Sequence, residues 1–291
     1  MSSPTSVRPA GRGGPRPELV DVPTGTTPLT GLFYEPDRGD GRVAQLFHGN
    51  GMNFYTGAPR FLPPVLHERG VAALAYNRHG HDTISCSTRE PEGNAYQTSA
   101  EAIADNDAAR DFLAALGYRA PIVIGHSNGG MLAAHHVSRH PDTPALVLLS
   151  AHLGGTDMLR LASANGLFAR DGAEEFGRRA RDLVDAGEGG TLLTMPGWYY
   201  VTTAASYIDV IDNSPRLLAD APSIACPVLF VRGARENPDL YPAEKFADLA
   251  GGPVDVRIID DCDHFYTEHE DQVATLVADW IDSVTSGRGT G

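Results

Sequence analysis

Short apolar runs alternate with helical patterns along most of this 291-residue chain, and this alternation limits the possible folds more than any other feature. The runs predict strands at residues 29–35, 43–49, 71–77, 121–126, 145–151, 227–233 and 254–260. Thr98 and Glu101 have the spacing of a capping box, which predicts a helix over residues 98–118, and a final helix is expected at residues 272–284. The pattern indicates an α/β fold built on a mostly parallel, doubly wound sheet with helices on both faces.

The alternation stops between residues 152 and 223, where helical pieces and loops occur without a convincing strand. A block inserted between two strands of such a sheet is expected to lie over the carboxyl ends of the strands, where ligands bind. We therefore predict a helical lid at residues 152–223 and an α/β core formed by residues 18–151 and 224–285. Flexible tails are expected at residues 1–17 and 286–291.

Charge and cysteine content exclude several classes of partner. The formal net charge is −14, so the average field of the protein repels nucleic acids and anionic membranes. No segment approaches the ~18 consecutive apolar residues that span a bilayer, and the N-terminal residues lack the apolar region of a signal peptide.

Cys86, Cys226 and Cys262 have unrelated spacings, which indicates reduced thiols. We expect a cytoplasmic monomer or homodimer that binds neither nucleic acid nor membrane.

The sequence GHSNG at residues 125–129 stands where a predicted strand gives way to a helix. This is the G-x-S-x-G pattern of a nucleophile elbow, in which the two glycines remove Cβ atoms that would collide in the tight turn. Gly130 allows a further close approach of helix to sheet. We predict that Ser127 is a nucleophile and that His126, its neighbour in the turn, points away from it and has a structural role.

A serine hydroxyl is a weak nucleophile until a base takes its proton and a third group orients the base. His264 lies in a loop after the last predicted strand, from which its imidazole could reach Ser127. Glu236 follows the preceding strand by one short turn, where it could accept a hydrogen bond from His264. The order serine, acid, histidine along the chain is that of the α/β-hydrolases.

With these motifs, residues 20–285 resemble the α/β-hydrolase fold family. The family typically carries its acid three residues after the glycine that ends the penultimate strand, and Glu236 stands three residues after Gly233. Aspartate is commoner than glutamate at that position. Asp239, close by, and Asp157, after the strand at residues 145–151, are therefore alternatives for the acid.

Two backbone N–H groups are expected to form an oxyanion hole. Asn128, directly after the nucleophile, supplies one of them. The pair His48 and Gly49 resembles the family's His-Gly loop, which implies that Asn50 supplies the other. Glycines on both sides of Asn50 allow its N–H to turn inward.

Five residues are candidate substrate contacts. His48 belongs to the predicted oxyanion loop, and His152 follows a strand at the functional edge of the sheet. Trp198, Tyr199 and Tyr200 are consecutive aromatic residues of the predicted lid, and on a helix they cannot all face one side. One is expected to face the sheet, which leaves another to contact the substrate.

Neither a metal nor another cofactor is predicted. His79, His81 and Asp82 lack the complete ligand spacing of a dinuclear zinc hydrolase, and His135 and His136 are expected to be surface or core residues of a helix. The chain contains no phosphate-binding loop and no dinucleotide fingerprint after its first strand.

Together these residues predict a serine hydrolase that cleaves a carboxylic ester or thioester of a small molecule through an acyl-enzyme. An acyltransferase or a lyase on the same scaffold is an alternative. A different class of protein, one that keeps the fold but only binds small molecules, is the other alternative. Such a protein usually lacks the nucleophile or the histidine, and this chain has both.

Overall fold

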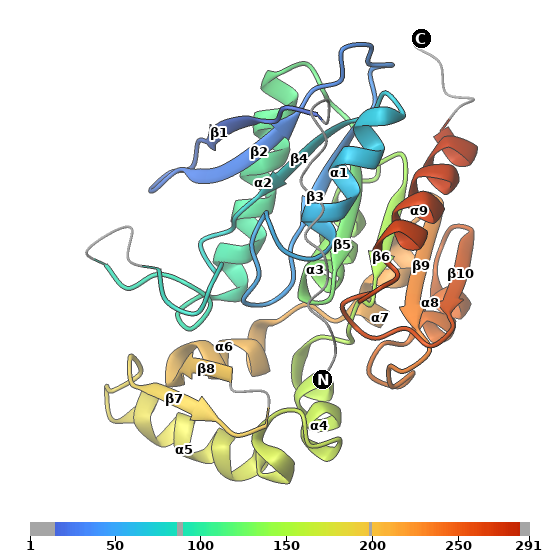
Figure 1. Ribbon diagram of the computed structural model, residues 1–291. Helices are drawn as coiled ribbons and strands as arrows, with labels where there is room; N and C mark the ends of the chain where they lie inside the picture. Colours follow the sequence, from blue (N-terminus) through green and yellow to red (C-terminus); the bar gives the residue numbers. More distant parts are fainter. Residues whose placement is uncertain (1–14, 86–89, 198–199, 286–291) are drawn as a thin grey trace, which may run out of the picture.

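The computed structural model describes residues 15–85, 90–197 and 200–285, and an eight-stranded sheet forms its centre (Figure 1). The strand order is β1-β2-β4-β3-β5-β6-β9-β10, with antiparallel pairing at β1–β2 and β2–β4 and parallel pairing elsewhere. The mostly parallel α/β sheet predicted from the sequence is confirmed. The strands are β1 (Glu18–Val22), β2 (Leu29–Tyr34), β3 (Val43–Phe47), β4 (Ala72–Tyr76), β5 (Ile122–His126), β6 (Leu146–Leu149), β9 (Val228–Gly233) and β10 (Val254–Ile259).

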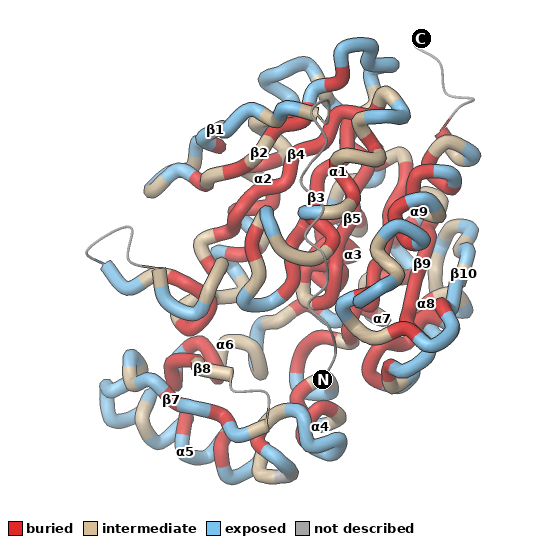
Figure 2. Tube along the Cα trace, in the orientation of Figure 1, coloured by how far each residue is buried: buried red, intermediate tan, exposed pale blue. Residues whose placement is uncertain are grey.

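Helices cover both faces of this sheet. On one face, apolar side chains of α1 and α9 pack with the strands, and on the other face those of α2, α3, α7 and α8 do so. Figure 2 shows that buried residues concentrate in the central strands. Strands β3, β4, β5, β6 and β9 are buried along their whole length, which explains their continuous apolar sequences. The helices are α1 (Ala58–Glu68), α2 (Ser99–Ala115), α3 (Asn128–Arg139), α7 (Leu217–Asp220), α8 (Ala243–Leu249) and α9 (Glu270–Thr285).

Helix α2 begins as its sequence predicted. The Thr98 side chain accepts from the Glu101 backbone N–H, and the Glu101 carboxylate accepts from the Thr98 N–H, which completes the capping box. Two donors that a helix start leaves unpaired are satisfied in this way.

Strand β1 was not predicted, because most of its residues are exposed and only Val22 is buried. A mostly exposed edge strand carries little of the apolar signal on which the other predictions depend. Cys86 and nearly all of the two predicted tails lie outside the described residues.

Residues 152–223 are called the insert below, and apart from α7 and η2, which pack with the core of the sheet, they lie beyond one end of the sheet (Figure 1). The prediction that this region has no strand was wrong, because β7 and β8 pair as an antiparallel hairpin. Side chains of α5, α6 and both strands form a small apolar core within the insert. Besides α7, its elements are α4 (Gly155–Ala164), η1 (Ala169–Asp171), α5 (Ala173–Asp185), β7 (Leu192–Met195), β8 (Tyr200–Thr203), α6 (Ala204–Asn213) and η2 (Ala221–Ser223).

None of the helices in the described ranges has both the length and the apolar character needed to cross a membrane.

Candidate active site

Ser127 occupies the turn between β5 and α3 in a strained conformation. Its φ is 56° and its ψ is −119°, values that a residue with a Cβ rarely adopts. The turn is held from both sides, because the Ser127 N–H donates to the Leu149 carbonyl at 2.8 Å and its own carbonyl accepts from Gly130 at 3.0 Å. The serine is 8% exposed. Strain of this kind is typical of functional sites, where the surrounding structure enforces it.

The glycines around Ser127 allow the backbone segments to approach closely. A Cβ on Gly125 would overlap the carbonyl of Gly129, and a Cβ on Gly129 would overlap the carbonyls of Phe47 and His48. The glycines two before and two after the serine are therefore required by packing, as the motif predicted.

Three side chains from distant parts of the sequence form a hydrogen-bonded line. His264, in the loop after β10, places its Nε2 3.0 Å from Ser127 Oγ and its Nδ1 2.6 Å from Glu236 Oε1. Glu236 follows β9 and is 8% exposed. Because Nδ1 must donate to the carboxylate, Nε2 can accept from the serine hydroxyl, which is the arrangement that removes a proton from serine.

The structure brings Glu236, rather than either alternative acid, to His264. Asp239 is exposed and forms an ion pair with Lys245 at 2.7 Å. Asp157 is exposed on α4 and lies 3.8 Å from Arg160.

Two residues that the sequence did not predict support the second carboxylate oxygen of Glu236: Ser150 directly, and Tyr266 through Ser150. Its Oε2 accepts from the Ser150 hydroxyl at 2.6 Å and from the Gly233 N–H at 2.8 Å. The Tyr266 hydroxyl lies 2.7 Å from Ser150 Oγ and 3.1 Å from the Val231 carbonyl. The two hydrogen bonds to Oε2 fix the orientation of the carboxylate. Ser150, directly after β6, has a positive φ of 46°, and nothing in the sequence predicts this backbone conformation.

His126 has the structural contact expected of it. Its Nε2–H donates to the His264 carbonyl at 2.9 Å, and its ring lies 4.9 Å from that of His264, measured between centroids. Burial lowers the pKa of His126 to about 3, so the ring is neutral at physiological pH. His126 therefore supports the backbone of His264.

The prediction that His48 contacts substrate was wrong. The side chain is fully buried and is not among the residues that line the cavity beside Ser127. Its Nδ1–H donates to the Gly49 carbonyl at 2.8 Å and its Nε2 accepts from the Arg78 N–H at 3.0 Å. The Arg78 guanidinium donates in turn to the His48 carbonyl at 2.8 Å. His48 thus fixes the loop that leads to Asn50.

Both residues predicted to form the oxyanion hole lie beside the serine. Asn50 and Asn128 line the same cavity as Ser127. Neither backbone N–H has a hydrogen-bond acceptor among residues 15–85, 90–197 and 200–285. Gly51 has a φ of 61°, which gives the loop a turn that glycine adopts readily.

His79 and His81 do not share a site. His79 Nδ1 lies 2.7 Å from Asp105, and His81 Nδ1 lies 3.2 Å from Asp82.

A cavity of about 320 Å³ contains Ser127 and His264 and extends beneath the insert. His152 lines it, and burial lowers the pKa of this histidine to about 3. Tyr200 also lines it, from β8 rather than from a helix, with its ring 5.4 Å from that of Phe168. Trp198 and Tyr199 lie outside the described residues.

The cavity wall carries no formal charge in the described part of the chain: none of its residues is Asp, Glu, Lys or Arg. Apolar residues of α3, of the insert and of the loop after β9 form much of the wall. The wall also includes the amides and hydroxyls of Asn94, Gln97, Thr98 and Thr202. The Gln97 Nε2 is buried without a hydrogen-bond partner among the described residues.

Residues 46–276 match the alpha/beta hydrolase family. The chain belongs to this family. Membership of this family supports hydrolase activity in general. The mostly parallel, eight-stranded sheet agrees with the family assignment. None of the curated protein sequences matches the chain significantly.

Several solved α/β-hydrolase structures share the fold at low sequence identity. An esterase from Butyrivibrio proteoclasticus with bound ferulic acid has a TM-score of 0.68 and 18% identity, over 92% of this chain and 99% of that one. A proline iminopeptidase from Mycobacterium smegmatis has a TM-score of 0.64 and 16% identity, over 93% and 99%. An esterase from Pyrococcus furiosus has a TM-score of 0.61 and 16% identity, over 93% and 92%. At this identity the likeness establishes the fold alone.

Proposed function

We propose that this α/β-hydrolase is a serine hydrolase that cleaves a carboxylic ester or thioester through an acyl-enzyme. The observation that carries the proposal is the line from Ser127 Oγ to His264 at 3.0 Å and from His264 to Glu236 at 2.6 Å, at the wall of a cavity large enough for a small organic substrate. Nucleophile, base and orienting acid are within hydrogen-bonding reach of one another, as this chemistry requires.

In the first half-reaction, Ser127 Oγ attacks the carbonyl carbon while His264 Nε2 takes the hydroxyl proton. Glu236 stabilises the imidazolium that forms. When the tetrahedral intermediate collapses, the bond to the leaving oxygen or sulfur breaks and His264 returns the proton to it. In the second half, His264 takes a proton from water, the hydroxide attacks the acyl-serine, and the proton returns to Ser127 Oγ.

The developing negative charge lies on the carbonyl oxygen, and the backbone N–H groups of Asn50 and Asn128 are the proposed donors. Support comes from their position at the cavity and from the lack of another acceptor for either group in the described ranges. Donors that need no rearrangement stabilise a transition state by about 3–4 kcal/mol each.

The uncharged wall favours a neutral substrate. Burying an unpaired carboxylate or ammonium in such a site costs several kcal/mol, because none of the described wall residues is Asp, Glu, Lys or Arg. We assign the acyl group to the apolar wall residues, among them Leu159, Phe168 and Tyr200, and a polar leaving group to the wall residues that carry amides and hydroxyls. His152 is a proposed contact near the reacting atoms.

Labelling with a fluorophosphonate, followed by peptide mapping, tests the nucleophile. The probe should modify Ser127, and Ser127→Ala and His264→Ala proteins should remain unlabelled and lose nearly all turnover, with roughly 10³–10⁴-fold catalysis over water remaining. Ser138→Ala is the matched control, because this serine lies on α3 and donates to the His135 carbonyl. Undiminished labelling of Ser127→Ala would remove the basis of the proposal.

A panel of p-nitrophenyl esters and acyl thioesters tests the substrate. Neutral acyl chains of four to six carbons should react faster than acetyl, and a chain of the same length that ends in a carboxylate should lose about 100-fold in kcat/KM. Product analysis with added alcohols separates hydrolysis from acyl transfer. Binding of the esters without turnover would identify a binding protein instead.

A further inference from the structure

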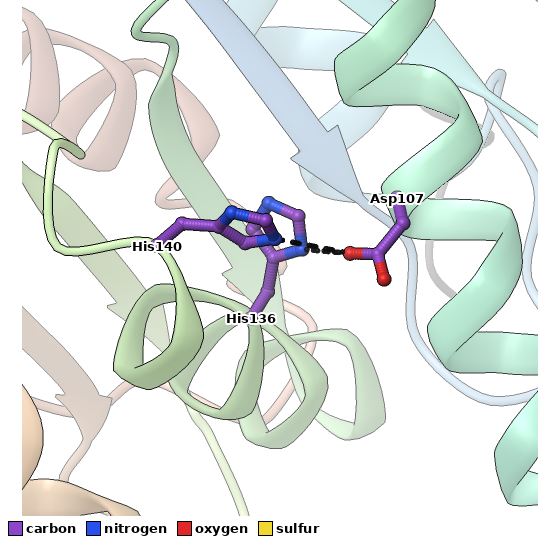
Figure 3. Close-up of side chains that lie close together, drawn as sticks. All are labelled: Asp107, His136 and His140. Carbon is purple, nitrogen blue, oxygen red and sulfur yellow. Dashed lines mark hydrogen bonds and ion pairs between the residues drawn. The ribbon is translucent and has the colours of Figure 1, made fainter.

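Asp107, His136 and His140 come together between α2 and the end of α3 (Figure 3), and none of them lines the cavity. Asp107 lies on α2, His136 in the last turn of α3, and His140 at the C-cap of α3. Asp107 Oδ1 is 3.0 Å from His136 Nδ1 and 3.2 Å from His140 Nε2. In the described part of the chain this is the one group of three or more His, Cys, Asp or Glu residues whose ligand atoms all lie within 4.8 Å of one another.

The hydrogen bonding of His136 is incomplete. Its side chain is 2% exposed, and neither ring nitrogen has a hydrogen-bond partner with suitable geometry among the described residues. The short distance from Nδ1 to Asp107 is therefore a close approach without a directed hydrogen bond. A buried polar atom left in this state is unfavourable, and a bound ion at Nδ1 would satisfy it.

We propose that Asp107 Oδ1, His136 Nδ1 and His140 Nε2 bind one divalent transition-metal ion, with Zn²⁺ as the ion that best fits this ligand set. Zinc binds histidine nitrogen and carboxylate oxygen at about 2.0–2.2 Å, so its tetrahedral ligands lie about 3.3–3.5 Å apart. The observed separations from Asp107 Oδ1, 3.0 and 3.2 Å, need to open only slightly. Water completes the coordination.

Two nearby arginines oppose a cation here, and each has a carboxylate partner. Arg139 lies 3.3 Å from Asp107 Oδ2, the oxygen that the ion does not use. Arg110 pairs with Asp142. The site joins α2 to the C-terminal end of α3. His136 follows Ser127 by nine residues, which is about 13 Å along the helix. We therefore expect the metal to stabilise the fold and to leave the chemistry at Ser127 unchanged.

Calorimetric titration of untagged, chelator-treated protein with ZnCl₂, and absorption spectra with CoCl₂, test the site. One equivalent should bind, and Co²⁺ should give the visible bands of a four-coordinate ion. At 100 times the dissociation constant, Zn²⁺ should raise Tm by about 5 °C, and a chelator should reverse the shift. The readout is metal binding, so the result does not depend on the proposed hydrolase activity.

Asp107→Asn and His140→Gln are the informative variants, because both residues are half-buried and both changes keep the side-chain size. Each should weaken Zn²⁺ binding by about 100-fold or more and abolish the Tm shift, with an unchanged circular dichroism spectrum. His135→Gln, one residue from His136 and paired with Asp220, should bind like the unmodified protein. Absence of binding, or equal binding by the Asp107 and His140 variants, would overturn the proposal.

Discussion

The proposed orienting acid, Glu236, is fixed by several hydrogen-bond donors. Glu236 receives hydrogen bonds from His264, Ser150 and Gly233, so both carboxylate oxygens have partners. Glutamate reaches one methylene further than the commoner aspartate. The contacts described above show that this longer side chain meets His264 at hydrogen-bonding distance.

Glu236→Gln should lower kcat by about 10⁴-fold with little change in KM, because an amide cannot hold the histidine in the required tautomer or stabilise its charged form. Steady-state kinetics on one neutral ester would measure this. Asp239→Asn is the matched control and should stay within about twofold of the unmodified enzyme. If Asp157→Asn were the damaging change, the assignment of the acid would be wrong.

Sequence patterns identified the residues of the hydrogen-bonded line but not those that support it. Ser127 belongs to a local motif, and His264 and Glu236 follow strands whose ends must meet at one edge of the sheet. Ser150 contacts Glu236, 86 residues away in the sequence, and Tyr266 contacts Ser150, 116 residues away. A lone serine at a strand end has no periodic or motif signal. Such contacts become visible only in the folded chain.

At the scale of elements, the hairpin β7–β8 shows where periodicity fails. Each strand has four residues, and β7 alternates exposed and buried positions. Two cycles of alternation are too few to separate a strand from a loop. The fully buried strands of the central sheet have continuous apolar sequences, which gave a clear signal, and they were all predicted.

Tyr200→Ala should raise KM about tenfold for bulky acyl esters and change that for acetyl esters much less, because lost apolar contact scales with the acyl area that Tyr200 covers. The measurement is KM across a series of acyl lengths. Leu192→Ala is the control, since this side chain is exposed on β7 of the same hairpin. Equal losses for every ester, together with a lower Tm, would show that Tyr200 only packs within the insert.

At the scale of the whole molecule, buried histidines set the response to acid. Burial lowers the pKa values of His48, His126, His136 and His152, and those of His126 and His152 fall to about 3. Of the described histidines with shifted pKa values, only His79 shifts upward, through its hydrogen bond with Asp105.

The protein should therefore lose stability as the pH falls from 7 to 5. A histidine with a folded pKa near 3 and an unfolded pKa near 6.5 binds more protons when unfolded in this range, so its contribution is complete above about pH 6.5 and declines below it. His126 and His152 should each account for about 2 kcal/mol of the loss by pH 5. Guanidinium unfolding at the two pH values measures the loss, and equal unfolding free energies would contradict the prediction.

The insert leaves the sheet after β6 and returns at β9, and these two strands are hydrogen-bonded neighbours in register at Leu146 and Val228. The nucleophile precedes this excursion, and the acid and the histidine follow it. Much of the wall that shapes the cavity therefore belongs to one continuous stretch of sequence, while the residues proposed to break bonds belong to others. Substitutions within residues 152–223 can therefore change which substrate fits the cavity without altering the residues proposed to catalyse the reaction.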